Sequence, residues 1–477
     1  MPGPTTEPMT EVQNLAAFVE RVRFADLSGK AAADLKIRVL DTLGVAIGAL
    51  DAAPVSAIRK LTAELGGAPL STLIGGGKTA PDRAAFYNGA LSRYLDFMDS
   101  YIATGETCHP SDNLGAVLAA AEMRGASGAD FLTALAVAYQ VQARLSDEAP
   151  VRDKGFDHTT QGAYAAAAGV AKALALSRDR IANAVAISGT ANNALRVTRT
   201  GALSHWKGLA YPNTAMAATH AALLAAHGIT GPQTVFEGNK GFKETVAGPF
   251  TINWLSEDLE RVRLTIVKQH NAEIHSQSAI DAALEIRQHP NFAAGGVRAV
   301  RLKTFAVAYH IIGGGVEGDK RVVRTKEEAD HSLPYLLAVA LIDGEVQPEQ
   351  FLPERIGAAD VQALLRKVTV TPDAALSAQF PKQLPADLEV ELRDGTALRA
   401  RRRDYHGFYT NPFDWAAARK KFDRVAWQFT DAAERDAIAD VVATLAERPV
   451  TDLTRLLGRI RRDVHASEFS ARERSAS

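Results

Sequence analysis

Residues 388–398 read Leu-Glu-Val-Glu-Leu-Arg-Asp-Gly-Thr-Ala-Leu, and this stretch decides the fold class. Apolar and charged residues alternate up to Arg393, which is the period-two pattern of a half-exposed β-strand. Asp394-Gly395 then precedes a second run, and this dipeptide favours a tight hairpin because both of its residues must adopt positive φ. A similar alternation over residues 300–304 predicts a further strand in the same region.

Helical periodicity surrounds this strand-rich region on both sides. From about residue 10 to 260 the chain is rich in alanine, and apolar residues such as Leu40, Leu43 and Ile47 recur at three- and four-residue spacing. The pattern returns from Trp415 to Leu457. The sequence therefore predicts a mainly α protein with a large multihelical domain, formed by residues 1–262 together with 404–477, and a smaller α+β domain over 263–403.

Composition excludes several classes of protein. The 477 residues carry 54 Lys+Arg against 55 Asp+Glu, so no excess of positive charge suggests nucleic-acid binding. No apolar run reaches the 18 or so residues that a membrane helix needs, and the polar N-terminus lacks a signal pattern. We therefore expect a cytoplasmic protein with neither a membrane nor a nucleic-acid partner. Cys108 is the single cysteine, which rules out an intrachain disulfide or an iron–sulfur cluster within one chain.

Two motifs resemble cofactor or metal sites but lack the required context. Gly313, Gly315 and Gly318 fit G-x-G-x-x-G, yet charged and β-branched residues follow them where a nucleotide site needs a helix. His270 and His275 are five residues apart, a spacing that does not place two zinc ligands on one helical face. We expect neither a cofactor nor a metal.

Basic or imidazole side chains recur just ahead of expected helix starts. They are His109, His158, Lys207, Lys268 and His275. A helix N-terminus attracts anions through its unpaired N–H groups, and the same field keeps a nearby histidine neutral, as a general base must be. Several such starts meeting in one cleft would bind a substrate with two or three carboxylates. The pattern is equally compatible with ordinary capped helix starts that carry surface side chains.

An acidic pair lies close to the first of these histidines. Asp96 and Asp99 fall at i and i+3 on a helix expected to end near Met98, with Arg93 on the same face. The following loop leads to His109, which a carboxylate could orient or polarise. A solvated acidic helix end would give the same spacing.

The chain as a whole resembles the MmgE/PrpD family, whose members include 2-methylcitrate dehydratase, cis-aconitate decarboxylase and iminodisuccinate epimerase. The resemblance rests on short stretches that occur in the family's order between about residues 40 and 345. They are residues 40–44, 88–89, 96–99, 109–111, 155–158, 195–201, 206–210, 275–277 and 329–335. The family fold, a multihelical domain with a smaller α+β domain, agrees with the organisation inferred from periodicity, and the resemblance also implies a homodimer.

The resemblance assigns roles to the residues already singled out. Asp96, His109 and His158 match the family's catalytic positions, and Lys207 and Lys268 match its substrate-binding lysines. We add Arg199 and His275 as further candidates for substrate binding.

The stretches 196–201 and 206–208 are most similar to the 2-methylcitrate dehydratase branch. The implied activity is a cofactor-independent hydro-lyase that converts 2-methylcitrate, or citrate, into the corresponding cis-aconitate-type alkene. Three alternatives stay open: decarboxylation of cis-aconitate, epimerisation of a related polycarboxylate, and a non-catalytic protein with the family fold. Glu317 and Gly318 lie where the decarboxylase branch has a tyrosine, which disfavours the first of these.

Overall fold

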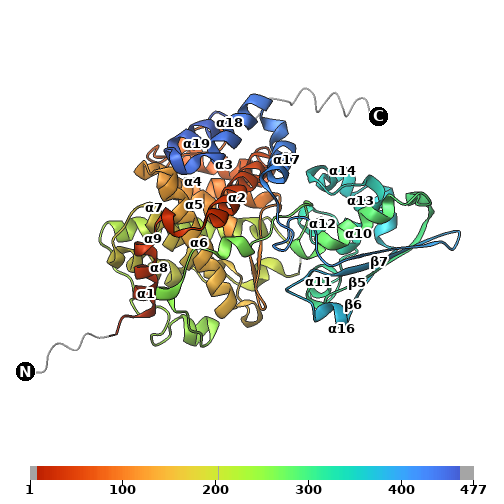
Figure 1. Cartoon of the computed structure of the whole chain (residues 1–477), viewed down its shortest axis with the longest axis horizontal. Coiled ribbons are helices and arrows are strands. Elements are labelled where there is room, and N and C mark those ends of the chain that lie inside the picture. Colours follow the sequence, from red (N-terminus) through yellow and green to blue (C-terminus); the bar gives the residue numbers. More distant parts are fainter. Residues whose placement is uncertain (1–7, 202, 462–477) are drawn as a thin grey trace, which may run out of the picture.

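The computed structural model describes residues 8–201 and 203–461, and it is mainly α-helical. The predicted fold class is confirmed. Figure 1 shows a large helical lobe and, beside it, a smaller lobe that contains the longer strands. Residues 1–7 and 462–477 of the predicted helical domain lie outside the described residues. In the part of the chain that is described, no helix combines the length and apolarity needed to cross a membrane.

The large lobe is a bundle of helices with an alanine-rich core. Its helices are α1 (Glu11–Arg21), α2 (Gly29–Ile47), α3 (Ala53–Leu65), α4 (Pro81–Tyr94), α5 (Leu114–Arg124), α6 (Gly128–Glu148), α7 (Thr159–Ala173), α8 (Arg178–Ala191), α9 (Trp206–Ala226), α17 (Trp415–Ala426), α18 (Ala432–Ala443) and α19 (Val450–Leu457). Small residues let these helices approach closely. A Cβ added to Gly162 of α7 would lie 2.4 Å from the ring of Tyr211 on α9. This contact fixes the N-terminal ends of α7 and α9 relative to each other.

Both ends of the chain contribute to one hydrophobic core. Phe422 of α17 and Leu453 of α19 belong to the same buried cluster as Val12 and Val262. Figure 1 shows the C-terminal helices, in blue, beside the red α2. A separate cluster joins residues between Ala272 and Ala400. The described residues thus form two main cores, and the domain division with boundaries at 262/263 and 403/404 stays a prediction.

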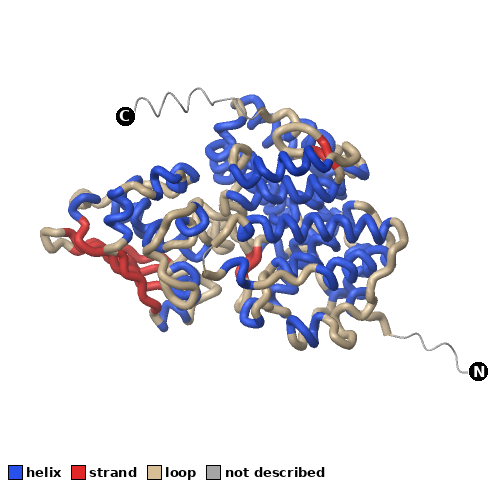
Figure 2. The backbone as a smooth tube through the Cα atoms, turned by 180° about the vertical axis from the view of Figure 1, so that it is seen from behind, coloured by secondary structure: helices blue, strands red, loops and turns tan. Residues whose placement is uncertain are grey.

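The small lobe is a mixed four-stranded sheet covered by helices. Its elements are α10 (Gln277–Arg287), β5 (Val297–Thr304), α11 (Ala306–Ile312), α12 (Lys326–Ala329), α13 (Leu333–Asp343), α14 (Pro353–Ile356), α15 (Ala359–Leu365), β6 (Val368–Pro372), α16 (Ala374–Ser377), β7 (Ala386–Leu392) and β8 (Ala397–Arg402). The strand order is β6-β5-β7-β8, with β5 parallel to β6 and the other pairs antiparallel. The hairpin predicted at Asp394-Gly395 and the strand predicted at residues 300–304 are both confirmed. Figure 2 shows the sheet, in red, at the edge of the molecule away from the helical lobe.

One face of the sheet is apolar and the other carries ion pairs. Leu388 and Val390 are buried in the core that also contains residues of α10 and α13. On the exposed face Arg301 pairs with Glu389 at 3.0 Å and with Glu391 at 2.7 Å. These opposite charges on neighbouring strands add modest stability to the sheet, and they occupy the charged positions of the predicted alternation.

Two helix boundaries differ from the sequence prediction. Helix α4 ends at Tyr94 rather than near Met98, so Asp96 follows the helix, in the left-handed region with φ 55°. The apolar spacing continued past the helix end because Phe97 and Met98 are buried as well. Helix α9 begins at Trp206, so Pro212 lies inside it and Lys207 belongs to its first turn.

Two short antiparallel pairs complete the helical lobe. Strands β1 (Ser71–Thr72) and β2 (Lys78–Thr79) form one pair, and β3 (Tyr101–Ile102) and β4 (Thr107–Cys108) form the other. The second pair matters for the site because it brings residues 99–100 next to residue 109.

Candidate active site

Six of the seven predicted site residues line one cavity of about 40 Å³, to which both lobes contribute. They are Asp96, His109, His158, Arg199, Lys268 and His275. The first four come from the helical lobe and the last two from the segment that leads into α10. The seventh, Lys207, does not line this cavity but lies against Asp96 from the other side. The helix starts that carry His109, His158 and His275 therefore meet at one cavity, and these side chains are buried rather than on the surface.

His109 is held in one tautomer by the main chain. Its Nδ1 lies 2.8 Å from the carbonyl oxygen of Asp99 and 3.0 Å from Oγ of Ser100. A carbonyl oxygen only accepts, so Nδ1 carries the hydrogen and Nε2 keeps its lone pair. Burial, together with the nearby charge of Arg93, lowers the pKa of His109 well below its ordinary value.

The carboxylate of Asp99 does not perform the role that the sequence suggested. It accepts hydrogen bonds from the Ser111 backbone at 3.1 Å and from the Tyr139 hydroxyl at 2.8 Å. Its backbone carbonyl, not its side chain, orients His109. Because Asp99 is fully buried, its side chain is not a solvated acidic helix end either.

His158 lies beside His109 and precedes α7. The two ring centroids are 5.4 Å apart, in an edge-to-face arrangement. Nδ1 of His158 is 3.3 Å from Oδ1 of Asp157, and its Nε2 is buried without a hydrogen-bond partner among the described residues. Burial lowers the pKa of His158 well below its ordinary value, although Asp157 opposes that shift.

Asp157 connects His158 to the arginines of the site. Nε of Arg199 donates to Oδ2 of Asp157 at 2.5 Å, and Arg196 lies 3.8 Å from the same oxygen. Burial would raise the pKa of Asp157, but Arg199 outweighs it and holds that pKa well below its usual range. The carboxylate therefore stays charged next to a neutral imidazole.

Asp96 bridges two lysines. Nζ of Lys268 donates to Oδ1 of Asp96 at 2.9 Å and to its backbone oxygen at 2.6 Å, while Nζ of Lys207 lies 3.4 Å from Oδ2. Burial alone would raise the pKa of Asp96, but the two ammonium groups hold it well below its usual range. Both lysines are almost fully buried.

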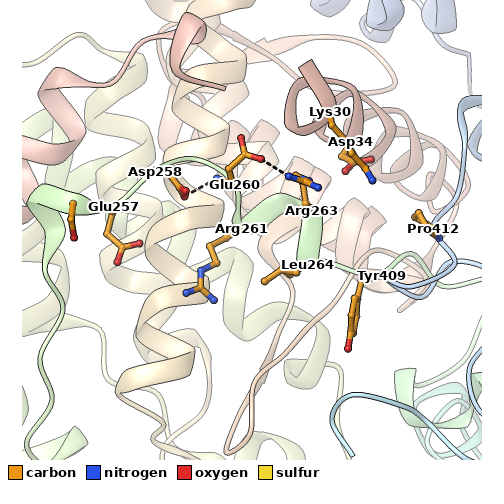
Figure 3. Close-up of a pocket in the computed structure, with 11 residues that line it drawn as sticks. Lys30, Asp34, Glu257, Asp258, Glu260, Arg261, Arg263, Leu264, Tyr409 and Pro412 are labelled. Atoms are coloured by element: carbon orange, nitrogen blue, oxygen red, sulfur yellow. Dashed lines mark hydrogen bonds and ion pairs between the residues drawn. The ribbon is translucent and has the colours of Figure 1, made fainter. Parts of the chain in front are cut away.

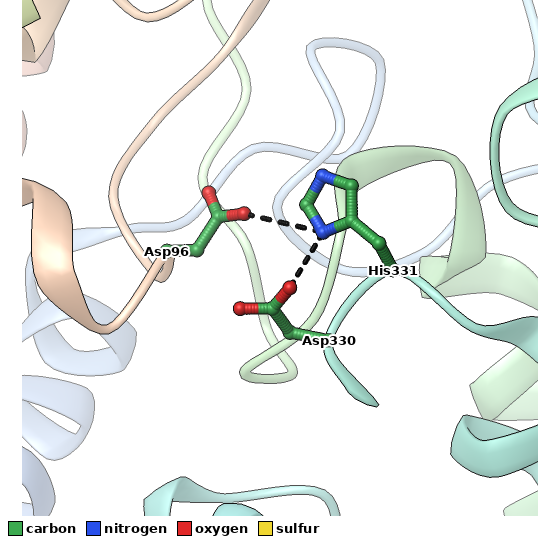
Figure 4. Close-up of side chains that lie close together, drawn as sticks. All are labelled: Asp96, Asp330 and His331. Atoms are coloured by element: carbon green, nitrogen blue, oxygen red, sulfur yellow. Dashed lines mark hydrogen bonds and ion pairs between the residues drawn. The ribbon is translucent and has the colours of Figure 1, made fainter. Parts of the chain in front are cut away.

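Asp96, Asp330 and His331 form a group that could in principle hold a metal ion, because one ligand atom from each lies within 4.8 Å of the others. Figure 4 shows the carboxylates of Asp96 and Asp330 directed towards Nδ1 of His331. Nζ of Lys207 lies 2.9 Å from both Oδ1 of Asp330 and Nδ1 of His331. The ammonium group thus satisfies the atoms that a metal would need, so the donor set does not fit a metal ion.

His275 has its own carboxylate partner. Nδ1 of His275 donates to Oε1 of Glu273 at 2.6 Å, and its Nε2 is buried without a partner among the residues that the structure describes. Burial would raise the pKa of Glu273, but His275 lowers it to about 2. The pair resembles the carboxylate-oriented imidazoles that act as acids or bases.

Sequence reasoning did not identify four further charged residues of the cavity wall as site residues: Arg152, Arg196, Glu273 and Glu317. Arg196 and Glu317 form an ion pair of 2.7 Å that connects the two lobes across the cavity. Nε of Arg152 is buried without a hydrogen-bond partner in the described chain. Arg196 lies in a stretch quoted for the family resemblance and Glu317 was noted as a departure from one branch, but only the tertiary structure shows that they meet.

A larger hollow, of about 440 Å³, lies elsewhere, around residues 256–264. Figure 3 shows that Glu260 pairs with Arg263 in its wall, at 3.0 Å. Arg261 is likewise paired, with Asp147 at 2.7 Å. Because these charges satisfy one another and no imidazole lines the hollow, it is a weaker candidate for catalysis.

Comparison with known proteins matches nearly the whole described chain to one family. Residues 13–255 match the MmgE/PrpD N-terminal domain and residues 270–447 the MmgE/PrpD C-terminal domain. The chain is 29% identical to a 2-methylcitrate dehydratase of Cupriavidus necator over 419 residues, covering 81% of this chain and 84% of that protein. It is 28% identical to a 2-methylcitrate dehydratase of Escherichia coli K12, with 80% and 83% covered. It is also 28% identical to a fungal alkylcitrate dehydratase, with 82% of each chain covered.

Proposed function

The chain belongs to the MmgE/PrpD family, and we propose that it is a hydro-lyase that removes water from a citrate-type tricarboxylate, 2-methylcitrate or citrate. The observation that carries the proposal is the meeting of two neutral imidazoles, His109 and His158, in a cavity with an excess of positive charge. The names of the relatives above favour this reaction over the decarboxylation and epimerisation that the sequence left open.

The charges of the cavity wall suit a polyanion. Five cationic side chains line it, against the three carboxylates of Asp96, Glu273 and Glu317; the cations are Arg93, Arg152, Arg196, Arg199 and Lys268. A bound tricarboxylate would more than compensate this excess in a setting of low dielectric constant. Arg152, whose Nε has no partner in the described chain, is the cation most available to a substrate carboxylate.

His109 is assigned as the general base. Its Nε2 carries the lone pair because Nδ1 donates to a main-chain carbonyl, and its lowered pKa keeps the ring neutral at pH 7. Nε2 takes the proton from the carbon next to a carboxylate. The electron pair left on that carbon develops enediolate character, which the fixed charges of Lys268 and Arg199 stabilise.

His158 is assigned as the general acid. As the electron pair forms the carbon–carbon double bond, the C–O bond to the β-hydroxyl breaks, and the leaving oxygen takes a proton from His158 to become water. Asp157 beside Nδ1 favours the imidazolium that this donation requires. The carboxylates of a bound substrate add negative charge, which raises the pKa of His158 in the complex.

Substrate entry requires movement of the cavity wall, because about 40 Å³ does not hold a tricarboxylate. Glu317 presents a carboxylate to Arg196, and a substrate carboxylate can take its place. Glu317 lies in a glycine-rich segment between α11 and α12 that has few regular elements. We therefore assign the 313–318 segment as the part of the wall that opens.

The test is an NMR assay of the purified protein with 2-methylcitrate, citrate and cis-aconitate. The expected result is an alkene product from one of the first two acids and no release of CO2 from the third. Replacing His109 or His158 by glutamine should lower kcat by about 10²–10⁴-fold. The exposed His227→Gln serves as control, with circular dichroism to check folding. Near-normal turnover of both active-site variants would overturn the assignment.

A further inference from the structure

A second cavity lies directly behind the candidate active site. Its volume is about 340 Å³, within the range of small-molecule sites. It is enclosed by α17, the loop before it, α10 and the turn after α13. None of the site residues discussed above lines it, so it is a separate space.

The wall of this cavity contains the chain neighbours of two active-site residues. Phe97 follows Asp96, and Gln269 and His270 follow Lys268. The Phe97 ring is fixed from the side of α17, because Nζ of Lys421 lies 3.9 Å from its centroid and donates to its backbone oxygen at 2.7 Å. A ligand here would therefore touch the two segments that hold the Asp96–Lys268 ion pair.

The lining combines apolar walls with three cations, Lys420, Lys421 and Arg424, and one carboxylate, Glu345. Phe97, Phe413 and Leu284 supply the apolar surface. Lys420 is exposed and has no ion-pair partner among the described residues, whereas Arg424 is paired with Glu349 at 2.8 Å.

A polar atom in the wall also lacks a partner. Oε1 of Gln269 is buried and accepts no hydrogen bond in the described chain. An unsatisfied buried amide costs free energy, which a ligand hydroxyl or amide could recover. This buried, unpartnered amide oxygen distinguishes the cavity from the hollow around residues 256–264, whose described lining residues contain no such atom.

We propose that this cavity is a second binding site, for a small organic anion with an apolar body, and that its occupation alters the active site through Phe97 and Gln269. The anionic group would pair with Lys420, and the apolar body would lie against Phe97 and Phe413. Coupling between sites is reciprocal in binding free energy, so a ligand here should change the affinity for substrate.

The binding test uses a charged and an uncharged probe of the same shape. 8-Anilinonaphthalene-1-sulfonate should bind the full chain once per chain with increased fluorescence, and Lys420→Glu should weaken it by about tenfold or more, which corresponds to about 1.4 kcal/mol. Lys420→Arg should retain binding, and Lys303→Glu, at an exposed position on β5, should leave it unchanged. The uncharged N-phenyl-1-naphthylamine should bind Lys420→Glu as it binds the unmodified protein.

Three outcomes would overturn the proposal. They are equal binding of the sulfonate by Lys420→Glu, parallel loss of both probes, and a change of mass in light scattering for Lys420→Glu, which would identify the surface as a contact between copies of the chain. The coupling is tested separately, as a change in KM on adding the sulfonate to active enzyme. Since probe fluorescence does not depend on turnover, failure of the proposed reaction would leave the binding result interpretable.

Discussion

Replacing Asp112 by asparagine should stabilise the protein by an amount that grows with pH. Asp112 follows His109 by three residues and is only 2% exposed. Neither carboxylate oxygen has a hydrogen-bond partner in the described chain, and the guanidinium of Arg93 is 3.9 Å away. Burial raises the pKa of this carboxyl from 3.8 to about 7.

The direction of this pH dependence follows from the protonation state of Asp112 that the folded protein prefers, which is the neutral carboxyl. A carboxyl whose pKa is higher in the folded state contributes stability that is complete below pH 3.8 and is lost as the pH rises through 7. At about 1.36 kcal/mol for each pKa unit, the loss approaches about 4 kcal/mol well above pH 7. Between pH 5 and pH 9 the free energy of unfolding of the unmodified protein should therefore fall, relative to Asp112→Asn, by about 3 kcal/mol.

The assay is urea unfolding of both proteins at several pH values, followed by circular dichroism. Subtracting the two curves removes every other titration that the proteins share, and any constant effect of the substitution appears as a pH-independent offset. Asp440→Asn, at an exposed position of α18, is the matched control and should give a flat difference. A flat difference for Asp112→Asn as well would refute the claim that this carboxyl is ionised at a cost.

Three further predictions concern the proposed reaction. Lys207→Gln should lower kcat with little change in KM, because Lys207 does not line the cavity and contacts it through Asp96 and His331, and should cost about 3–5 kcal/mol of stability as a broken buried pair; a raised KM with unchanged kcat would mean direct contact with substrate. Glu317→Gln should lower KM about fivefold, the equivalent of about 1 kcal/mol of ion pairing released at Arg196; a higher KM would show that Glu317 helps to hold the substrate. Exhaustive treatment with EDTA should leave activity unchanged, whereas a loss restored by a divalent ion would contradict the role given to the ammonium of Lys207.

Local sequence patterns were sufficient to predict most of the fold. The hairpin at Asp394-Gly395 and the helix starts that follow His158 and His275 depend on residues within a few positions of each other, and periodicity records such dependence directly. The end of α4 was missed because Phe97 and Met98 continue the apolar spacing although they lie in a buried loop. The spacing of apolar residues indicates which residues are buried, not where a helix ends. It therefore continues beyond the helix whenever the next segment also enters the core.

The site was predictable where its residues stand at helix starts, and not where charges meet across the fold. Arg196 and Glu317 are separated by 121 positions, and nothing in either neighbourhood indicates the other. Lys207 was expected ahead of a helix start but lies in the first turn of α9, and its ammonium faces Asp96 and Asp330 rather than the cavity. Whether a buried lysine binds substrate or supports a carboxylate is decided by its three-dimensional neighbours alone.

The left-handed backbone conformation of Asp96 follows from the same network of buried ion pairs. A left-handed conformation at a residue other than glycine costs about 1–3 kcal/mol and persists only where the surroundings enforce it. Nζ of Lys268 provides that enforcement, since it binds both the backbone oxygen and Oδ1 of Asp96. The left-handed turn at the end of α4 aims the carboxylate between Lys268 and Lys207, where an α-helical residue would direct it along the helix surface. The departure from helical geometry that sequence periodicity could not indicate is therefore what brings the carboxylate into the site.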